Sequence, residues 1–337
     1  MSVIEKKAEL EAYFHDAGKP RERWRVGTEY EKVGIDRSTA KAIPYFGRRG
    51  VEFILRELIE RFGWEPQEQE GHIIALARGN AMITLEPGGQ IELSGEPCES
   101  IHCTHAEFTQ HIRELLEVAE PLDIVFLGLG MQPVSRLEEI EWVPKKRYRI
   151  MGPYMPKVGS LGQRMMKERG HNGERATLED WNDHLTTLFP ETRIKRYIEV
   201  RSVDSQPPEL MLALPALVKG AFYDADCLQA AWDLVKDWSW DERMQVYLDS
   251  HRDALSARVR RYSLFDLAKE LFQIAWEGLR RQNALNKQGE DETIYLSPLK
   301  NLLFQGKCPA DVLVEKWEGE LEHDIKKLIS YSAYKLL

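Results

Sequence analysis

The chain has 337 residues, of which 43% are hydrophobic, so it can bury a large core in one big domain or two ordinary ones. Its net charge is -9, and its 46 basic residues are scattered among 55 acidic ones without a basic block, which argues against a nucleic-acid groove. The N-terminus lacks an apolar core of signal-peptide length, and no apolar run approaches the length of a membrane span. We therefore expect a cytoplasmic protein with no membrane or nucleic-acid partner.

Helices and strands are mixed in the first half of the chain. Apolar residues that recur at helical spacing predict helices, and alternation with period 2 predicts strands. The turn signal Gly79-Asn80 separates two β-rich runs and predicts a hairpin. In chain order we predict a helix at 3–16, a strand at 24–35, a helix at 50–62, hairpin strands at 72–78 and 81–86, a helix at 100–119 and a buried strand at 124–130.

The second half reads as almost wholly helical after one further strand. Residues 141–162 are rich in Pro, Gly and basic groups and predict an ordered loop or lid, whereas residues 163–175 are strongly polar and predict no packed element. A helix at 177–188 precedes a strand at 193–203. Further helices are predicted at 209–221, 225–236, 263–281, 309–320 and 321–336.

The four cysteines are too few and too scattered for a disulfide framework, so we predict reduced thiols at Cys98, Cys103, Cys227 and Cys308. Two of them lie in the run Cys98-Glu-Ser-Ile-His-Cys-Thr-His105, which has the composition of a metal cluster. Its spacing fits no standard zinc ligand set, and a helix is predicted to begin there, so the sequence argues against zinc.

Residues 83–95 carry the most informative pattern in the chain. Thr84, Glu86, Gln90 and Glu92 share one parity, and apolar residues occupy the other, which is the period-2 pattern of a strand with one acidic face. Carboxylates aligned on one face of a strand repel each other unless a cation lies between them. Glu86 and Glu92 therefore predict a metal site.

Two other predicted strands have the same feature, with Glu29 and Glu31 on the first and Glu199 beside Arg201 on the last. If one antiparallel sheet gathers all three strands, five carboxylates line a concavity that suits hard divalent cations such as Mg²⁺. Such metals would let an acidic protein hold a nucleotide, and Arg201 would neutralise phosphate oxygens. The alternative is that each strand turns a solvated acidic face outward, which is the better explanation for one strand alone but not for three.

These stretches resemble glutamate–cysteine ligases of the plant and proteobacterial type over nearly the whole chain. The matching segments include Val26-Gly-Thr-Glu-Tyr-Glu-Lys32 and Ile83-Thr-Leu-Glu-Pro-Gly-Gly-Gln-Ile-Glu-Leu-Ser-Gly95. Further matches lie at 126–133, 144–148, 154–162 and 183–201.

The resemblance implies an α+β fold in which a curved, mainly antiparallel sheet forms a funnel wrapped by helices, as in carboxylate–amine ligases of the glutamine-synthetase-like type. It implies a single catalytic domain over 1–337, with a sheet-rich part at 1–162 and one strand followed by helices at 174–337. The implied reaction phosphorylates the γ-carboxylate of glutamate with ATP and transfers the acyl group to the amine of cysteine. The product, γ-glutamylcysteine, is the first intermediate of glutathione biosynthesis. A monomer or homodimer is expected.

The resemblance also assigns roles to individual residues. Arg201 matches the phosphate-contacting arginine, so Arg201 and Glu199 are expected to be catalytic, and Lys195 is expected to join Arg201 at the nucleotide. Arg147 and Tyr148 lie where the family helps to hold the amino-acid substrate. The magnesium-binding positions of the family correspond to Glu29, Glu31, Glu86, Glu92 and Glu199.

One departure from the family follows Gly162, where the family continues through a long segment that includes a central strand of the sheet. In this chain residues 163–173 lead directly to the next family motif at 174–181. Loss of an interior strand leaves backbone groups unpaired, so the sheet must pair anew, split or be completed by another subunit. The sequence therefore leaves open an active ligase, a ligase for a different amine, or a non-catalytic relative that binds nucleotide or metal.

Overall fold

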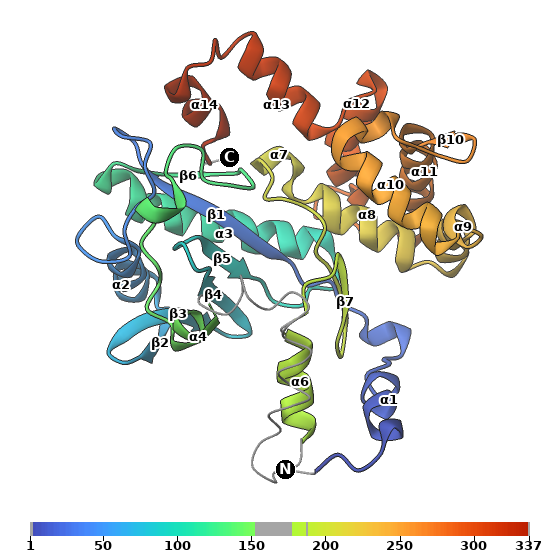
Figure 1. Cartoon of the computed structure of the whole chain (residues 1–337), viewed down its shortest axis with the longest axis horizontal. Coiled ribbons are helices and arrows are strands. Elements are labelled where there is room, and N and C mark those ends of the chain that lie inside the picture. The colour runs from blue at the N-terminus through green and yellow to red at the C-terminus, as the bar shows by residue number, and fades with distance from the viewer. Residues whose placement is uncertain (1–2, 152–176, 187, 336–337) are drawn as a thin grey trace. The chain divides into compact units, whose positions relative to one another are not determined.

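The computed structural model describes residues 3–151, 177–186 and 188–335 (Figure 1). They belong to two compact units. The larger unit comprises Arg25–Val143 and Ser205–Leu337, and the smaller unit comprises Met1–Trp24 and Pro144–Asp204. The family segment at 154–162, the polar segment at 163–175 and the departure after Gly162 lie outside the described residues. That the whole chain forms one catalytic domain stays a prediction.

A six-stranded antiparallel sheet forms the centre of the larger unit, which confirms the predicted α+β class (Figure 1). Its strand order is β2-β3-β4-β5-β1-β6. The strands are β1 (Glu29–Asp36), β2 (Glu65–Gln69), β3 (His72–Arg78), β4 (Ala81–Leu85), β5 (Ile91–Ser94) and β6 (Ile124–Leu127).

The stretch at 83–95 is two strands and not the single strand that its alternation predicts. Gly89 has φ +79°, and its N–H donates to the carbonyl oxygen of Glu86 at 2.9 Å, so the chain reverses between β4 and β5. A positive φ is a conformation that glycine adopts without strain. The turn keeps the parity of the pattern, because Leu85 pairs with Ile91 and Thr84 pairs with Glu92. The acidic face therefore survives the reversal.

The two faces of the sheet are covered differently. On one face, Tyr30 of β1 packs against Phe108 of α3 (Ile101–Ala119), with ring centroids 4.7 Å apart. On the opposite face, the β1–β6 half is apolar and packs against Ile329 of α14 (Ile325–Ser332). The remainder of that second face carries the carboxylates of the candidate site.

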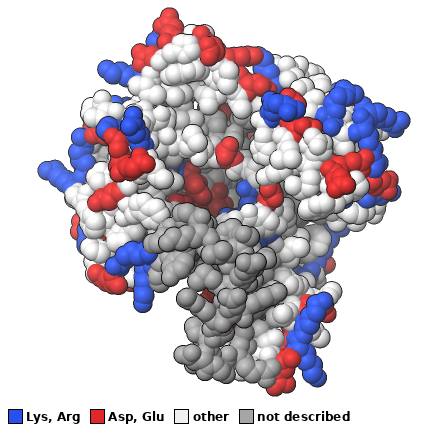
Figure 2. All heavy atoms as spheres, in the orientation of Figure 1, with Lys and Arg blue, Asp and Glu red and all other residues white. Residues whose placement is uncertain are grey.

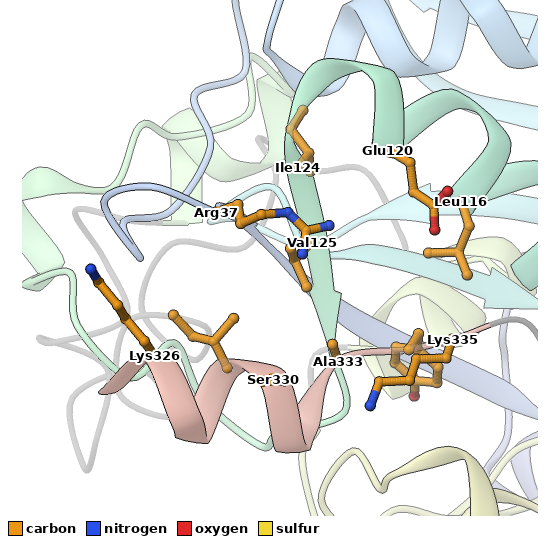
Figure 3. Close-up of a pocket in the computed structure, with 11 residues that line it drawn as sticks. Arg37, Leu116, Glu120, Ile124, Val125, Lys326, Ser330, Ala333 and Lys335 are labelled. Atoms are coloured by element: carbon orange, nitrogen blue, oxygen red, sulfur yellow. The ribbon is translucent and has the colours of Figure 1, made fainter. Parts of the chain in front are cut away.

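A segment near the C-terminus closes the free edge of β6. Leu127 forms an antiparallel bridge with Ala333, Gly128 N–H donates to the carbonyl oxygen of Ser332 at 3.0 Å, and Tyr334 N–H donates to that of Phe126 at 2.8 Å. A cavity of about 330 Å³ lies beside this contact, lined by side chains of β6, α14 and the end of α3 (Figure 3). No predicted site residue lines it.

Helices make up most of the rest of the larger unit. α8 (Ala213–Phe222) and α11 (Leu264–Gln282) cross closely at two glycines, because a Cβ built on Gly278 would lie 1.9 Å from the carbonyl oxygen of Gly220. The predicted helices at 50–62, 225–236, 263–281 and 309–320 are present, but α10 and α12 were not predicted. The remaining elements of the unit are α2 (Val51–Phe62), α7 (Pro208–Met211), α8 (Ala213–Phe222), α9 (Ala225–Val235), α10 (Trp240–Asp253), β9 (Arg258–Val259), β10 (Tyr262–Ser263), α11 (Leu264–Gln282), α12 (Ser297–Gln305) and α13 (Pro309–Glu318).

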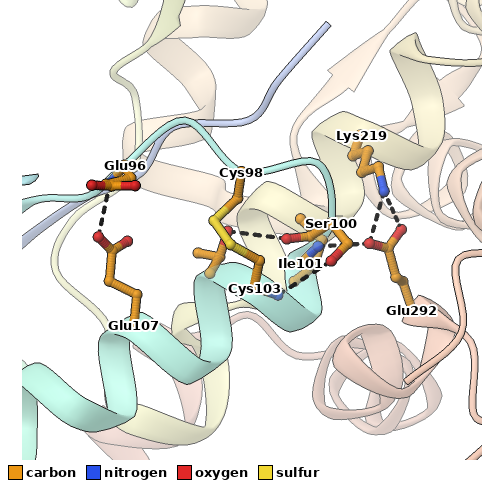
Figure 4. The surroundings of a disulfide bond; sticks show 9 residues. Glu96, Cys98, Ser100, Ile101, Cys103, Glu107, Lys219 and Glu292 are labelled. Atoms are coloured by element: carbon orange, nitrogen blue, oxygen red, sulfur yellow. Dashed lines mark hydrogen bonds and ion pairs between the residues drawn. A yellow bond between two sulfur atoms is a disulfide. The ribbon is translucent and has the colours of Figure 1, made fainter. Parts of the chain in front are cut away.

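The prediction that all four cysteines are reduced is wrong. Cys98 and Cys103 form a disulfide with Cα atoms 5.8 Å apart, whereas Cys227 and Cys308 are free (Figure 4). Cys98 also exchanges two backbone hydrogen bonds with Val26, of 2.9 and 2.8 Å. The chain passes from this bridge into the first turn of α3, so five residues of sequence bring the two sulfur atoms together. Because they are bonded to each other, these cysteines offer no thiolate to zinc.

A buried ion pair lies beside the same helix start (Figure 4). Lys219 of α8 donates to both carboxylate oxygens of Glu292, at 2.7 and 2.5 Å, and neither side chain reaches solvent appreciably. Glu292 lies in the 3₁₀ turn at Glu292–Leu296 and also accepts a hydrogen bond from the N–H of Ile101 at 2.6 Å. One carboxylate thus joins α8 to the first residue of α3.

The smaller unit contains α1 (Lys7–His15), α4 (Lys146–Met151), α6 (Leu178–Thr186), β7 (Thr192–Ile194) and β8 (Ile198–Val200). Tyr13 of α1 donates from its hydroxyl to Asn182 of α6 at 2.8 Å. The strand predicted at 193–203 is in fact a hairpin, because Lys195 N–H donates to the carbonyl oxygen of Tyr197 and the chain turns back. β7 and β8 form a separate two-stranded sheet.

Candidate metal centre

Most of the predicted acidic residues lie on one face of the six-stranded sheet. Glu31 of β1 pairs with Glu92 of β5, and Glu92 pairs on its other side with Thr84 of β4. Glu29 is one same-face position away, opposite Ser94. Directly opposed residues of antiparallel strands share a face, as do residues two apart in one strand. The strand register thus gathers these side chains into one patch.

Glu86 joins this patch at the β4–β5 turn. Its N–H donates to the carbonyl oxygen of Gln90 at 3.0 Å, which extends the ladder by one pair. Glu31, Glu86 and Glu92 each offer one carboxylate oxygen, and these three atoms lie within 4.8 Å of one another. Two oxygens on opposite sides of one Mg²⁺ are about 4.2 Å apart, so small side-chain rotations would let the three share an ion.

The neighbouring carboxylates of the patch repel the charge of Glu31. Burial against its neighbours and the charges of Glu86, Glu92 and Glu29 raise the pKa of Glu31 to about 7, and the charge of Lys32 opposes this only in part. A carboxyl group that resists ionisation in this way is stabilised in its charged form by a nearby cation. The patch therefore has the electrostatics of a cation site.

Lys32 lies on the opposite face of the sheet from Glu31 and is fully buried. Burial lowers its pKa to about 7, although the charges of Glu92 and Glu31 favour the ammonium form. Its Nζ atom donates to the carbonyl oxygen of Tyr30. Lys32 is the one basic residue of β1, and its side chain lies on the face of the sheet away from the carboxylates.

Glu92 is the most buried of the three carboxylates, with 9% of its surface exposed. Its Oε1 atom accepts a hydrogen bond from the Thr84 hydroxyl at 2.7 Å and from the Ser94 hydroxyl at 2.8 Å. The Oε1 atom of Gln90 is buried and has no hydrogen-bond partner among the described residues. Sequence reasoning placed Thr84 and Gln90 on this face but gave neither a role, and it missed Ser94, which shares the parity of Glu92.

Glu199 has a different environment, in the smaller unit. Its carboxylate pairs with Arg193 at 2.6 Å, Arg201 at 3.2 Å and Lys195 at 3.5 Å. Burial alone would raise the pKa of Glu199, but the hydrogen bond and charge of Arg193, with the charges of Lys195 and Arg201, lower it. The condition that one antiparallel sheet gathers all five carboxylates is not met, because β8 pairs with β7 in a separate sheet. A metal-binding or catalytic role for Glu199 stays a prediction.

Arg147 and Tyr148 lie in α4 of the smaller unit. The Arg147 guanidinium lies 5.0 Å from the centroid of the Tyr148 ring, and its Nη2 atom donates to the Tyr148 hydroxyl at 3.2 Å. This contact fixes the two side chains relative to each other. Their role in substrate binding stays a prediction.

The profile of the glutamate-cysteine ligase family 2 (GCS2) matches residues 25–167 and 164–327, which include the carboxylate patch and the β7–β8 hairpin. The chain belongs to this family. The membership predicted from the sequence motifs is thereby confirmed, and with it the class of enzyme, a ligase.

Curated relatives of the family agree with this profile. The chain is 30% identical to the chloroplastic glutamate–cysteine ligase A of Oryza sativa subsp. indica over 441 positions, which cover 97% of this chain and 88% of the relative. It is also 30% identical over 427 positions to the chloroplastic glutamate–cysteine ligases of Nicotiana tabacum and Arabidopsis thaliana, covering 93% of this chain and 80% of each relative.

These comparisons bear on two of the expectations. The alignment with the rice enzyme spans 441 positions against 337 residues, so roughly a hundred positions of the relative have no counterpart in this ligase. The two matched pieces of the family profile meet at residues 164–167, next to the departure predicted after Gly162. The expected cytoplasmic location is contradicted, because the plant ligases to which the chain is similar are chloroplastic.

The surface charge and the character of the helices bear on the classes of partner that the protein binds. Basic and acidic side chains are interspersed over the visible face of the described residues (Figure 2). Among the helices of the described part of the chain, none has both the length and the apolar character that a membrane crossing requires. Small molecules are the substrates that suit this family of ligases.

Proposed function

We propose that this ligase uses ATP and Mg²⁺ to join the γ-carboxyl group of L-glutamate to the amine of L-cysteine. The observation that carries the proposal is the convergence of Glu31, Glu86 and Glu92 within 4.8 Å, in a chain of the glutamate–cysteine ligase family. The product would be γ-glutamylcysteine, the first intermediate of glutathione biosynthesis.

The donor set of the patch fits Mg²⁺. Glu31, Glu86 and Glu92 supply only carboxylate oxygens, which hard divalent cations prefer. The buried amide oxygen of Gln90 adds an acceptor without a partner among the described residues. Glu29 lies next to Glu31 on the same face and could bind a second ion. Bound magnesium would neutralise charge on the phosphates of the nucleotide.

The reaction transfers a phosphoryl group and then an acyl group. A γ-carboxylate oxygen of glutamate attacks the terminal phosphorus of ATP, and ADP leaves. The cysteine amine then attacks the acyl carbon, phosphate leaves with the bonding electrons, and the nitrogen loses a proton. In this proposal Arg201 and Lys195 neutralise phosphate oxygens, and the ion pairs of Glu199 with both residues orient them. Arg147 and Tyr148 hold the amino-acid substrate.

A second candidate is a relative with another amine substrate or with no catalysis. One observation favours it: roughly a hundred positions of the rice ligase have no counterpart here. Such a protein would be a γ-glutamyl ligase for a different amine, or a partner protein that binds nucleotide or metal.

One assay separates these candidates. The protein is incubated with ATP, Mg²⁺ and glutamate, with cysteine or a panel of simple amines, while ADP release and product mass are measured. We expect cysteine-dependent ADP release and γ-glutamylcysteine, both lost in Glu86→Gln and retained in Glu68→Gln, a matched change at an exposed residue of β2. Faster turnover of another amine would identify the altered-specificity ligase. No ADP release above background would overturn the ligase proposal, and calorimetry with ATP would then test for a binding protein.

A further inference from the structure

We infer that Thr84 and Ser94 are positioning residues of the metal site, which act by fixing the orientation of the Glu92 carboxylate. This inference rests on the proposed function, because it concerns how the proposed ligand Glu92 is presented to a divalent cation. Neither hydroxyl is expected to contact the cation itself.

Two hydroxyls from different strands converge on one oxygen atom. Thr84 of β4 donates to Oε1 of Glu92 at 2.7 Å, and Ser94 of β5 donates to the same atom at 2.8 Å. The strand pairing explains this, since Thr84 lies directly opposite Glu92 and Ser94 follows it by two residues on the same face. All three side chains therefore point to one side of the sheet.

Both hydroxyls bind Oε1 of Glu92, so the second carboxylate oxygen, Oε2, is left to bind a cation. A carboxylate has about four acceptor positions, two on each oxygen, and the hydroxyls occupy those of Oε1. Ionised acceptors form the stronger kind of hydrogen bond, so this double contact restrains the rotation of the carboxylate group. Oε2 of Glu92 thus keeps its acceptor positions free of these two donors, on the face that it shares with Glu31 and Glu86.

Fixing Glu92 in advance matters because a free glutamate side chain loses rotamer entropy when it is immobilised by a bound ion. Glu92 is 9% exposed and held by two donors, whereas Glu31 is exposed. We infer that Glu92 is the prearranged ligand of the site and that Glu31 adjusts to the ion. Loss of a group that orients a metal ligand through a hydrogen bond typically weakens metal binding by about 10- to 100-fold.

The test measures binding of Mn²⁺ alone, by the electron paramagnetic resonance signal of the free ion, in the full chain without ATP. Thr84→Val keeps the shape of the side chain and removes the donor, and Ser94→Ala removes the other. We expect each variant to bind Mn²⁺ about tenfold more weakly, the double variant to bind still more weakly, and Thr84→Ser to restore the wild-type affinity. Ser297→Ala, at an exposed hydroxyl on α12, serves as the matched control.

The outcomes separate this inference from the proposed function. If Glu92→Gln abolishes Mn²⁺ binding but the double hydroxyl variant binds as tightly as the wild type, the positioning role is overturned and the metal site stands. If the wild type binds no Mn²⁺, both are overturned. Thermal unfolding of each variant shows whether it is folded. The inference is also overturned if Thr84→Val lowers the melting temperature and Thr84→Ser fails to bind Mn²⁺ as tightly as the wild type. Those two results together would mean that Thr84 supports the fold as a whole.

Discussion

Replacing Glu31 with glutamine should stabilise the metal-free protein at pH 8 while weakening its stabilisation by Mg²⁺. Burial and three neighbouring carboxylates raise the pKa of Glu31 to about 7, so above this pH its charge opposes folding. Glutamine keeps the shape of the side chain without the charge. It also removes a ligand from the proposed site, so added Mg²⁺ should raise the melting temperature of Glu31→Gln less than that of the wild type.

The magnitude follows from the pKa. The rise from the ordinary value of 4.5 to about 7 corresponds to about 3 kcal/mol at roughly 1.36 kcal/mol per unit. Neighbouring groups desolvate the Glu31 carboxyl, but the residue as a whole is exposed, so solvent screening reduces the expected effect to about 1–2 kcal/mol. In a chain of 337 residues that is a rise of about 1–3 °C in melting temperature.

The pH dependence has a definite sign. The folded protein binds the Glu31 proton more tightly than the unfolded chain, so the penalty is complete above pH 7 and disappears as the pH falls towards 4.5. The advantage of Glu31→Gln over the wild type should therefore shrink between pH 8 and pH 5. Lys32, whose lowered pKa is also about 7, is present in both proteins, so the difference between them reports mainly on Glu31.

The assay is thermal unfolding of the wild type, Glu31→Gln and Glu68→Gln at pH 8 and pH 5, each with EDTA or with Mg²⁺. Glu68 lies in β2, where it is exposed, and serves as the control for loss of one negative charge. Added salt should reduce the advantage, since it screens exposed charges. The reasoning is refuted if Glu31→Gln with EDTA melts at or below the wild-type temperature at pH 8, or if Mg²⁺ stabilises both proteins equally.

Three further perturbations test other parts of the fold. Lys219→Met leaves the buried Glu292 carboxylate without its cation and should cost about 3–5 kcal/mol in urea unfolding. The double change Lys219→Met with Glu292→Met should recover only part of that loss, because the N–H of Ile101 then lacks its acceptor. Reduction of the Cys98–Cys103 disulfide should cost about 2 kcal/mol, and dithiothreitol should no longer lower the melting temperature of Cys98→Ser. Deletion of residues 332–337 should expose the edge of β6 and increase aggregation, measured by light scattering; unchanged scattering and melting temperature would contradict the edge-closing role.

The acidic face could be predicted from the sequence because the β4–β5 turn keeps alternate side chains on the same face of the sheet in both strands. Glu86 and Glu92 stay on one face although the chain reverses between them, since Thr84 pairs with Glu92. The reversal itself was missed, although Pro87-Gly88-Gly89 is a turn signal. Motifs also identified the family, which the profile confirms.

Other features depend on contacts that alternation does not encode. β2 has the sequence Glu-Pro-Gln-Glu-Gln and lacks the apolar residues that reveal a strand, as befits a sheet edge. The neutralisation of Glu199 by Arg193 follows from the β7–β8 turn, which periodicity alone did not show. α10 was missed despite a capping box between Ser239 and Glu242, a signal that was available in the sequence.

The closing of β6 by residues 332–334 has a consequence for how the protein is made. During synthesis, β1 and β6 can pair as soon as residue 127 has left the ribosome, but the partner of Leu127 is Ala333. Until then the nascent chain carries an open strand edge, the kind of surface that pairs with other chains. Protection of this edge therefore waits until residue 333 has been translated, after the helices that follow β6 in the sequence.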